Sequence, residues 1–152
     1  MDNSIENEII FETLKELNDN GQIIFKDENK WQFFTKAMDE YLPALETTNS
    51  SWGTNWVYYY WFEKYEDKLI IHFELGGWNL TDELTKRSNL LIEASKKKVD
   101  EYRYKRLYYK SAKLTQDDYE ESLKNATKSL IKSALENEKK LLSAVKEIDS
   151  ES

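Results

Sequence analysis

The stretch Trp56–Leu75, WVYYYWFEKYEDKLIIHFEL, determines which fold the chain can adopt. It holds two runs rich in aromatic and β-branched residues, Trp56–Tyr65 and Lys68–Leu75, and such runs are typical of β-strands. Only the dipeptide Glu66-Asp67 connects them, and so short a connection joins antiparallel strands. The sequence therefore predicts a β-hairpin. One face of its second strand carries Leu69, Ile71, Phe73 and Leu75.

Helical periodicity precedes the hairpin. Apolar residues at helical spacing predict one helix over residues 3–18 and a second that begins after Asp27 and ends near Pro43. The polar residues 46–55, ETTNSSWGTN, then predict a long loop before the hairpin.

After the hairpin we expect a helix over 82–98, capped by Thr81, and a third strand over 101–111, EYRYKRLYYKS. The sequence thus predicts an α+β fold with a small three-stranded, mainly antiparallel sheet and four helices. Their order is helix, helix, hairpin, helix, strand and long helix. We expect one domain over residues 1–150, because each apolar face must find a partner.

The last helix is expected to open at a capping box of Thr115 and Asp118 and to run to about residue 147. A helix of that length spans roughly 48 Å, so we expect a break near Asn137 or a partner for its far end. If that end protrudes, the apolar residues around Leu141, Leu142 and Val145 predict a homodimer through the C-terminal helix.

The composition excludes several kinds of site. The 152 residues include no cysteine and one histidine, so disulfides and thiolate zinc sites are excluded and a histidine-rich metal site is not expected. Residues 1–10 lack the basic flank and apolar run of a signal peptide, and no run is apolar enough to span a membrane. We expect a cytoplasmic protein with no membrane contact, no cofactor and no metal.

Charge is distributed unevenly along the chain. The formal net charge is −7, and residues 1–50 alone contribute −7, whereas residues 81–113 contribute +5. Either this basic segment neutralises the acidic helices around it, or it steers a partner of opposite charge. The acidic N-terminal segment allows a further hypothesis, an inhibitor that competes with nucleic acid for a basic protein.

The expected third strand interleaves tyrosines with cations, a combination found in proteins that bind single-stranded nucleic acid. Strict alternation would turn Tyr104, Arg106, Tyr108 and Lys110 to the same face. The competing interpretation is that the tyrosines fill a thin sheet and the basic side chains cover their rings. The residues of the nucleic-acid alternative are Arg103, Lys105, Arg106, Tyr108 and Lys110.

The sequence contains few side chains that could carry out catalysis. His72 shares a strand face with Glu74, and we interpret it as a hydrogen-bonded structural histidine rather than a proton-transfer dyad. The fragments Glu66-Asp67-Lys68 and Glu28-Asn29-Lys30 match the acid-x-Lys pattern of metal-dependent nucleases, but they fall on a predicted turn and a helix start. We therefore do not expect an enzyme.

Aromatic residues, at 14% of the chain, exceed what a core of this size readily hides, and Trp, Tyr and Arg anchor protein interfaces. We interpret the chain as a non-enzymatic module that binds another protein through an aromatic-rich sheet surface. The candidate contact residues are Trp52, Trp56, Trp61, Trp78, Tyr104 and Arg106.

The segment Trp56–Lys110 adds a resemblance. Its aromatic strand, its Phe-Glu-Leu-Gly strand end at 73–76 and the Arg87-bearing helix resemble the region downstream of the catalytic core in bacterial PD-(D/E)XK nuclease-superfamily proteins. The catalytic Asp and acid-x-Lys strand of that family have no convincing counterpart here. The resemblance implies an accessory domain without nuclease activity, in bacterial or phage defence or counter-defence.

Overall fold

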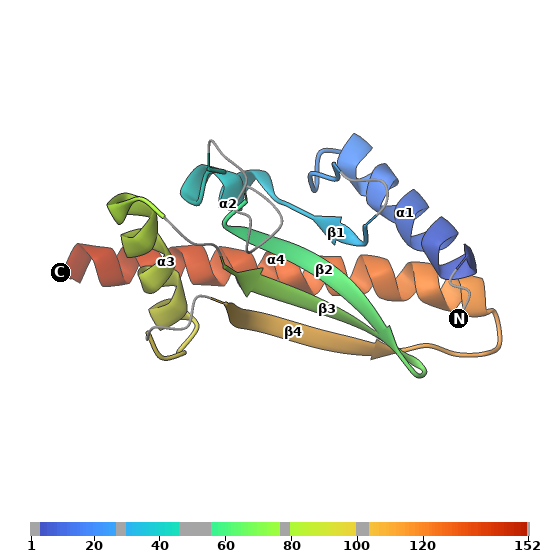
Figure 1. Cartoon of the computed structure of the whole chain (residues 1–152). Coiled ribbons are helices and arrows are strands. Elements are labelled where there is room, and N and C mark those ends of the chain that lie inside the picture. Colours follow the sequence, from blue (N-terminus) through green and yellow to red (C-terminus); the bar gives the residue numbers. More distant parts are fainter. Residues whose placement is uncertain (1–3, 27–29, 46–55, 77–79, 100–103, 152) are drawn as a thin grey trace.

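The computed structural model of the chain describes residues 4–26, 30–45, 56–76, 80–99 and 104–151. An antiparallel sheet lies across a long C-terminal helix, and shorter helices pack around the two (Figure 1). In chain order the elements are α1 (Ser4–Asp19), β1 (Gln32–Phe33), α2 (Lys36–Tyr41), β2 (Tyr58–Tyr65), β3 (Lys68–Leu75), α3 (Asp82–Ala94), β4 (Lys105–Lys113) and α4 (Tyr119–Glu151). The fold is α+β.

The predicted hairpin is confirmed. β2 and β3 pair antiparallel from Tyr58 opposite Leu75 to Tyr65 opposite Lys68. In the turn between them Glu66 has a φ of 54°, the left-handed conformation that tight hairpin turns use. The side chains that the hairpin buries are Tyr58, Tyr60, Phe62, Leu69, Ile71, His72, Phe73 and Leu75.

The prediction of a three-stranded sheet is wrong, because residues expected near the start of the second helix form a fourth strand. β1 pairs antiparallel with β2, with Gln32 opposite Trp61 and Phe33 opposite Tyr60. The sheet has four strands in the order β1-β2-β3-β4, and every neighbouring pair is antiparallel.

Aromatic packing on consecutive residues explains the difference. Phe33 stacks on Tyr60 with ring centroids 4.9 Å apart, and Phe34 packs against Trp56 at 4.6 Å. Phe33 and Phe34 are adjacent in the sequence, and both are buried. Two adjacent apolar residues do not distinguish a strand from a helix. α2 begins only after Thr35, whose side chain caps it by accepting a hydrogen bond from the backbone of Met38.

A β-bulge lies where β3 meets β4. Phe73 pairs with Tyr108 and Glu74 pairs with Arg106, so Leu107 is an extra residue in the register. The bulge overturns the strict alternation expected from the sequence, because it separates the face that carries Arg106 from the one that carries Tyr108.

α4 forms the layer behind the sheet and runs for 33 residues without the expected break. The expected capping box does not form: the Thr115 hydroxyl donates to the carbonyl of Asp117, and the Asp118 carbonyl accepts from the backbone of Ser122. The residues that α4 buries are Leu123, Ala126, Thr127, Leu130, Ile131, Ala134, Glu138, Leu141 and Val145.

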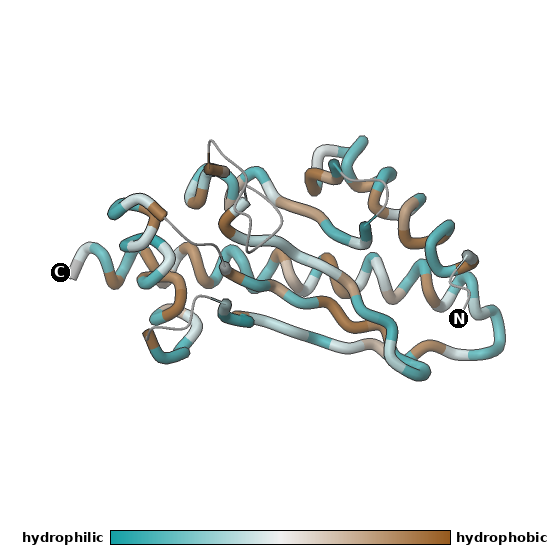
Figure 2. Tube along the Cα trace, viewed as in Figure 1, coloured by the Kyte–Doolittle hydropathy of each residue, from teal (hydrophilic) through white to brown (hydrophobic). Residues whose placement is uncertain are grey.

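The N- and C-terminal parts of α4 have different partners. α1 packs against the first half of α4, and α3 packs across its far end (Figure 1). The expected partner for the far end is therefore α3, whose Leu90 lines a hollow together with Leu142 and Val145 of α4. Figure 2 shows hydrophobic residues along β3 and the inward sides of the helices, whereas β4 is mostly pale or hydrophilic.

One face of the sheet points away from α4, and no described helix lies in front of it (Figure 1). We call this surface the open face. By register it carries four cross-strand rows: Tyr59, Glu74 and Arg106; Trp61, His72 and Tyr109; Glu63, Ile70 and Ser111; and Tyr65, Lys68 and Lys113.

Candidate functional site

The row of the open face that holds Trp61, His72 and Tyr109 is aromatic. Trp61 on β2 stacks on His72 of β3, with ring centroids 4.5 Å apart and planes 26° from parallel. Tyr109 lies opposite His72 on β4, and 67% of its surface is exposed. Along this row the His72 ring on β3 is therefore buried, and the Tyr109 ring on the edge strand β4 is exposed.

His72 is held as a structural residue, as its sequence context predicted, but its partner differs. Its Nε2 lies 3.0 Å from Oε1 of Glu63, on the neighbouring strand, rather than near Glu74. Only 2% of His72 is exposed, and its Nδ1 is buried without a hydrogen-bond partner, as is Nε1 of Trp61. Packing against Trp61, rather than a full set of hydrogen bonds, holds the imidazole in place.

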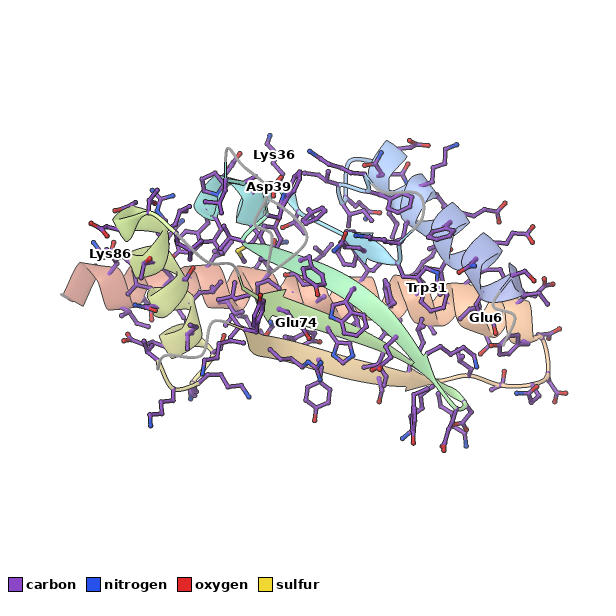
Figure 3. All side chains as sticks on the ribbon, in the orientation of Figure 1. Glu6, Trp31, Lys36, Asp39, Glu74 and Lys86 are labelled. Atoms are coloured by element: carbon purple, nitrogen blue, oxygen red, sulfur yellow. The ribbon has the colours of Figure 1, made fainter. Side chains whose placement is uncertain are left out.

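An ion pair forms the adjacent row. Nε and Nη2 of Arg106 both donate to Oε1 of Glu74, at 3.0 and 2.9 Å. Figure 3 shows Glu74 on the side of the sheet turned away from α4. Burial, followed by the nearby Glu74 carboxylate, raises the pKa of Tyr59 in the same row, so its hydroxyl stays protonated at neutral pH. The guanidinium of Arg106 is thus fixed in orientation while half of its side chain stays exposed.

The candidate contact residues are divided by the fold. Trp61 lies on β2 and Arg106 lies on β4. Tyr104 comes just before β4, and 43% of its surface is exposed. Trp56 is instead half-buried beside α2, where its Nε1 donates to Oδ1 of Asp39 at 3.0 Å and Lys26 lies over its ring. Trp52 and Trp78 lie outside the described residues.

The residues of the nucleic-acid alternative are also divided. Arg106 is on the open face, but Tyr108 and Lys110 turn toward α4, where Lys110 Nζ donates to Ser133 Oγ at 2.9 Å and Tyr108 also bonds Ser133. Lys105 is half-buried at the start of β4. Arg103 lies outside the described residues. β3 separates β2 from β4, so the rings of β2 and the cations of β4 do not form adjacent strands.

A buried polar cluster, which sequence reasoning missed, joins the sheet to α4 and α2. The Glu138 carboxylate oxygen Oε2 accepts hydrogen bonds from the hydroxyls of Tyr60 and Thr35, both at 2.7 Å. Nearby, the Tyr58 hydroxyl donates to Asp39 Oδ1 at 2.6 Å. A glutamate within the apolar stripe of α4, between Ala134 and Leu141, is the sequence signal that indicates such a cluster.

Burial controls the ionisation of this cluster. Desolvation raises the pKa of Glu138, although the hydrogen bonds from Thr35 and Tyr60 oppose that rise by stabilising the charged form. Desolvation likewise raises the pKa of Tyr58 and Tyr60 well above the usual tyrosine value. Both phenols therefore act as hydrogen-bond donors.

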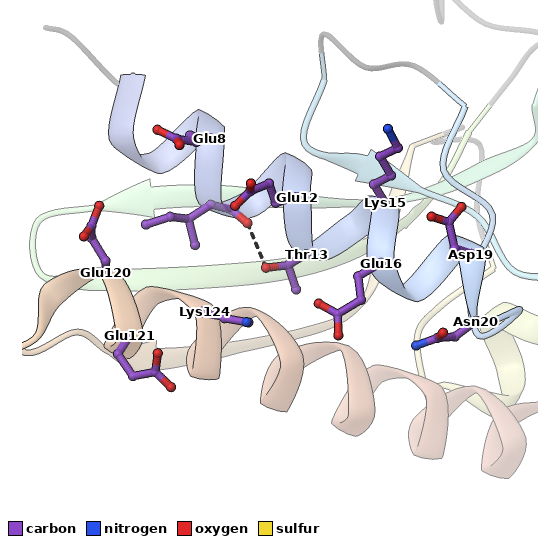
Figure 4. A pocket seen from close by; sticks show the side chains of 11 residues that line it. Glu8, Glu12, Thr13, Lys15, Glu16, Asp19, Asn20, Glu120, Glu121 and Lys124 are labelled. Carbon is purple, nitrogen blue, oxygen red and sulfur yellow. Dashed lines mark hydrogen bonds between the residues drawn. The ribbon is translucent and has the colours of Figure 1, made fainter.

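An acidic groove runs between α1 and the start of α4 (Figure 4). Its volume is about 840 Å³, and Thr13, at its base, is tied to the carbonyl of Ile9. Lys128 beside it pairs with Glu16 at 3.3 Å. The charged side chains that line the groove are Glu8, Glu12, Lys15, Glu16, Asp19, Glu120, Glu121 and Lys124.

A second hollow lies among α2, α3 and the end of α4. Arg87 ties α3 to α2, because its Nη1 donates to the carbonyl of Tyr41 at 2.9 Å and the Tyr41 hydroxyl donates back to the carbonyl of Arg87. Burial raises the pKa of Tyr41 to about 12. Leu142, half-buried, lines this hollow. A homodimer through this end stays a prediction.

Within the described ranges, no group of three or more His, Asp or Glu side chains is placed to hold a metal ion. The helices found there also include none with an apolar stretch that could cross a membrane. No family model, curated protein or solved structure matches this chain.

Proposed function

We propose that the protein is a non-enzymatic interaction module that binds another protein through the open face of its sheet. The observation that carries this proposal is the neighbourhood of Tyr109, a two-thirds exposed ring beside the fixed Arg106–Glu74 pair. Tyrosine and arginine supply much of the binding energy in protein interfaces. A surface of this composition on a regular sheet therefore suits a protein partner.

Rigidity of the platform supports the same proposal. The strands of the open face are held from behind by fully buried rings such as Tyr60 and Phe73, which stack at 4.6 Å. Binding loses less conformational entropy when the contact residues are already held in place. The stacked Trp61 and His72 and the paired Arg106 meet that condition.

The pairing of charges on the open face favours a protein over a nucleic acid. Glu74 neutralises Arg106, and Glu63 places a second carboxylate on the same face beside His72. The face also carries Lys68 and Lys113, and Lys113 lies 3.9 Å from the carboxylate of Asp67. Nucleic-acid affinity depends on cations that meet phosphates. The net charge of −7 opposes a polyanion as well.

A capture experiment tests the proposal. The full chain is immobilised as wild type, as Tyr109→Ala and as Ile5→Ala, an exposed apolar residue on α1. We expect a protein from the cells of origin to be retained by wild type and by Ile5→Ala but not by Tyr109→Ala, with or without nuclease. Retention that nuclease abolishes, or that Tyr109→Ala leaves intact, would contradict the proposal.

A second candidate is the acidic inhibitor, and the groove between α1 and α4 favours it. Carboxylates outnumber lysines among the groove residues, so a basic protein segment would be attracted there. Glu12→Lys is expected to weaken capture of a basic partner while Tyr109→Ala leaves it unchanged. The opposite pattern supports the open face. Bacterial or phage defence is the setting that we propose for either function.

A further inference from the structure

β4 is a long strand that lies at the edge of the sheet. It has nine residues and, among the described residues, pairs only with β3. Figure 1 shows no described element beyond it. An edge strand offers its outer backbone N–H and C=O groups to an added strand. At the opposite edge, β1 offers only two residues.

The charge of β4 restricts what can be added. Its sequence KRLYYKSAK contains four cations and no acid. Arg106 and Lys113 lie on the open face, and Lys110 turns toward α4, so cations flank the edge on both sides. Lys113 is 77% exposed and its nearest carboxylate, on Asp67, is 3.9 Å away. A strand that carries acidic side chains on both of its faces complements both rows.

The same charges disfavour a second copy of this chain at the edge. Antiparallel pairing of two β4 strands about Tyr109 would place Lys105 of each copy opposite Lys113 of the other. Like charges directly opposite one another destabilise a sheet. The occupant therefore has a different sequence from β4.

Room for the added strand exists beside α4. A hollow of about 480 Å³ lies where the end of β4 meets α4. Small residues such as Ala112, Ser122, Asn125 and Ser129 line it together with Lys113 and the carboxylates Asp117, Asp118 and Glu121. Neighbouring strands lie about 4.8 Å apart, so a strand beside β4 reaches over this hollow. The side chains of the added strand that enter the hollow are therefore small or basic, and its acidic side chains lie nearer to Lys110 and Arg106.

We propose that β4 receives an extended acidic segment of a protein partner, which adds to the sheet as a fifth strand. Backbone hydrogen bonds hold the segment, its carboxylates pair with Lys110, Lys113 and the exposed side of Arg106, and Tyr109 packs beside it. This inference rests on the proposed function, because it specifies how the partner that contacts the open face is recognised.

A library of random dodecapeptides displayed on phage, selected on the immobilised full chain at low salt, tests the inference. We expect the selected peptides to be enriched in Asp or Glu on both faces of an extended strand, and their affinity to fall as salt rises. N-methylation of alternate backbone nitrogens in a selected peptide is expected to abolish binding, because it removes donors that strand addition uses. A selection without acidic peptides, or no selected peptide at all, overturns the inference.

Charge reversals locate the site. Lys110→Glu with Lys113→Glu is expected to weaken the selected peptides by about tenfold or more, as loss of close charge pairs does. Lys139→Glu with Lys140→Glu, the same two changes on exposed positions of α4, is the matched control and should change affinity less than about twofold. Equal affinity of the peptides for the β4 variant and for the control overturns the inference. If the β4 variant fails to fold, the salt dependence and the N-methylated peptides still test the inference on the wild type.

The outcomes separate this inference from the proposed function. If the captured partner depends on Tyr109 but peptides ignore the β4 charges, strand addition fails and the open-face function stands. If labelled oligo(dT) binds the wild type and the Lys110→Glu, Lys113→Glu variant loses that binding, a nucleic-acid function replaces both the open-face function and strand addition. If no protein depends on Tyr109, the proposed function fails.

Discussion

The hydroxyl of Tyr60, at the centre of the sheet, donates a 2.7 Å hydrogen bond to the buried carboxylate of Glu138 on α4. Tyr60 and Glu138 are 78 residues apart in the chain, and both are buried. Since Thr35, the cap of α2, donates to the same oxygen, one carboxylate joins three elements behind the open face.

Glu138→Ala is expected to destabilise the fold. It leaves the hydroxyls of Tyr60 and Thr35 buried without an acceptor, and each orphaned group costs about 1–3 kcal/mol. We expect the free energy of unfolding in urea to fall by about 3 kcal/mol. Glu138→Gln, which keeps an acceptor oxygen, should cost less than the alanine variant. An alanine variant as stable as wild type would show that the cluster does not hold α4 to the sheet.

The raised pKa of Glu138 predicts a pH dependence of stability. Because the folded state binds this proton more tightly than the unfolded state, the contribution of Glu138 is fully present below its unfolded pKa and is lost as pH rises through the raised folded pKa. Glu138→Gln lacks this titration. The difference in unfolding free energy, wild type minus Glu138→Gln, should therefore decrease with rising pH across that window and then become constant. A difference that increases with pH would contradict the direction of the shift.

The Arg106–Glu74 pair should contribute little to stability despite its geometry. Only 16% of the Glu74 side chain is exposed, but half of the Arg106 side chain is, so water reaches the pair; pairs that water reaches contribute about 0.2–1 kcal/mol. We expect a double-mutant cycle with Arg106→Ala and Glu74→Ala to give a coupling in that range, and one that decreases with salt. A coupling of several kcal/mol would show that the pair is a structural element rather than part of a binding surface.

Thr81 is expected to stabilise α3 as its N-cap. Its side chain accepts a 3.1 Å hydrogen bond from the backbone of Leu84, and loss of such a cap costs about 1 kcal/mol. Thr85→Ala, inside the same helix, is the control, because alanine has the higher helix propensity. Chemical denaturation should rank Thr81→Ala below wild type and Thr85→Ala at or near it. The reverse ranking would contradict the cap.

The parts of the fold that the sequence predicted are those with a single local signal. Alternation identified the buried face of β3, and Thr81 marked the start of α3. β1 was missed because the adjacent, buried Phe33 and Phe34 fit strand and helix alike. Tertiary pairing with Tyr60 decided between them.

The candidate site was predicted in part, for a related reason. Trp61 and Arg106 were identified from composition and lie on the open face. Tyr109 was not selected. Strict alternation places it on the face opposite Arg106, and only the bulge at Leu107 brings both to one surface. A bulge depends on pairing between strands, so the sequence of one strand does not reveal it.

Photo-cross-linking in cells of origin tests whether the open face contacts a protein. Benzoylphenylalanine is placed at Tyr109 on the open face, at Ile5 on α1, and at Lys140 on the outer side of α4. We expect position 109 to form a cross-link to a protein, and positions 5 and 140 to do so much less. Cross-links to nucleic acid at position 109, or a protein cross-linked from position 140 and not from 109, would contradict it.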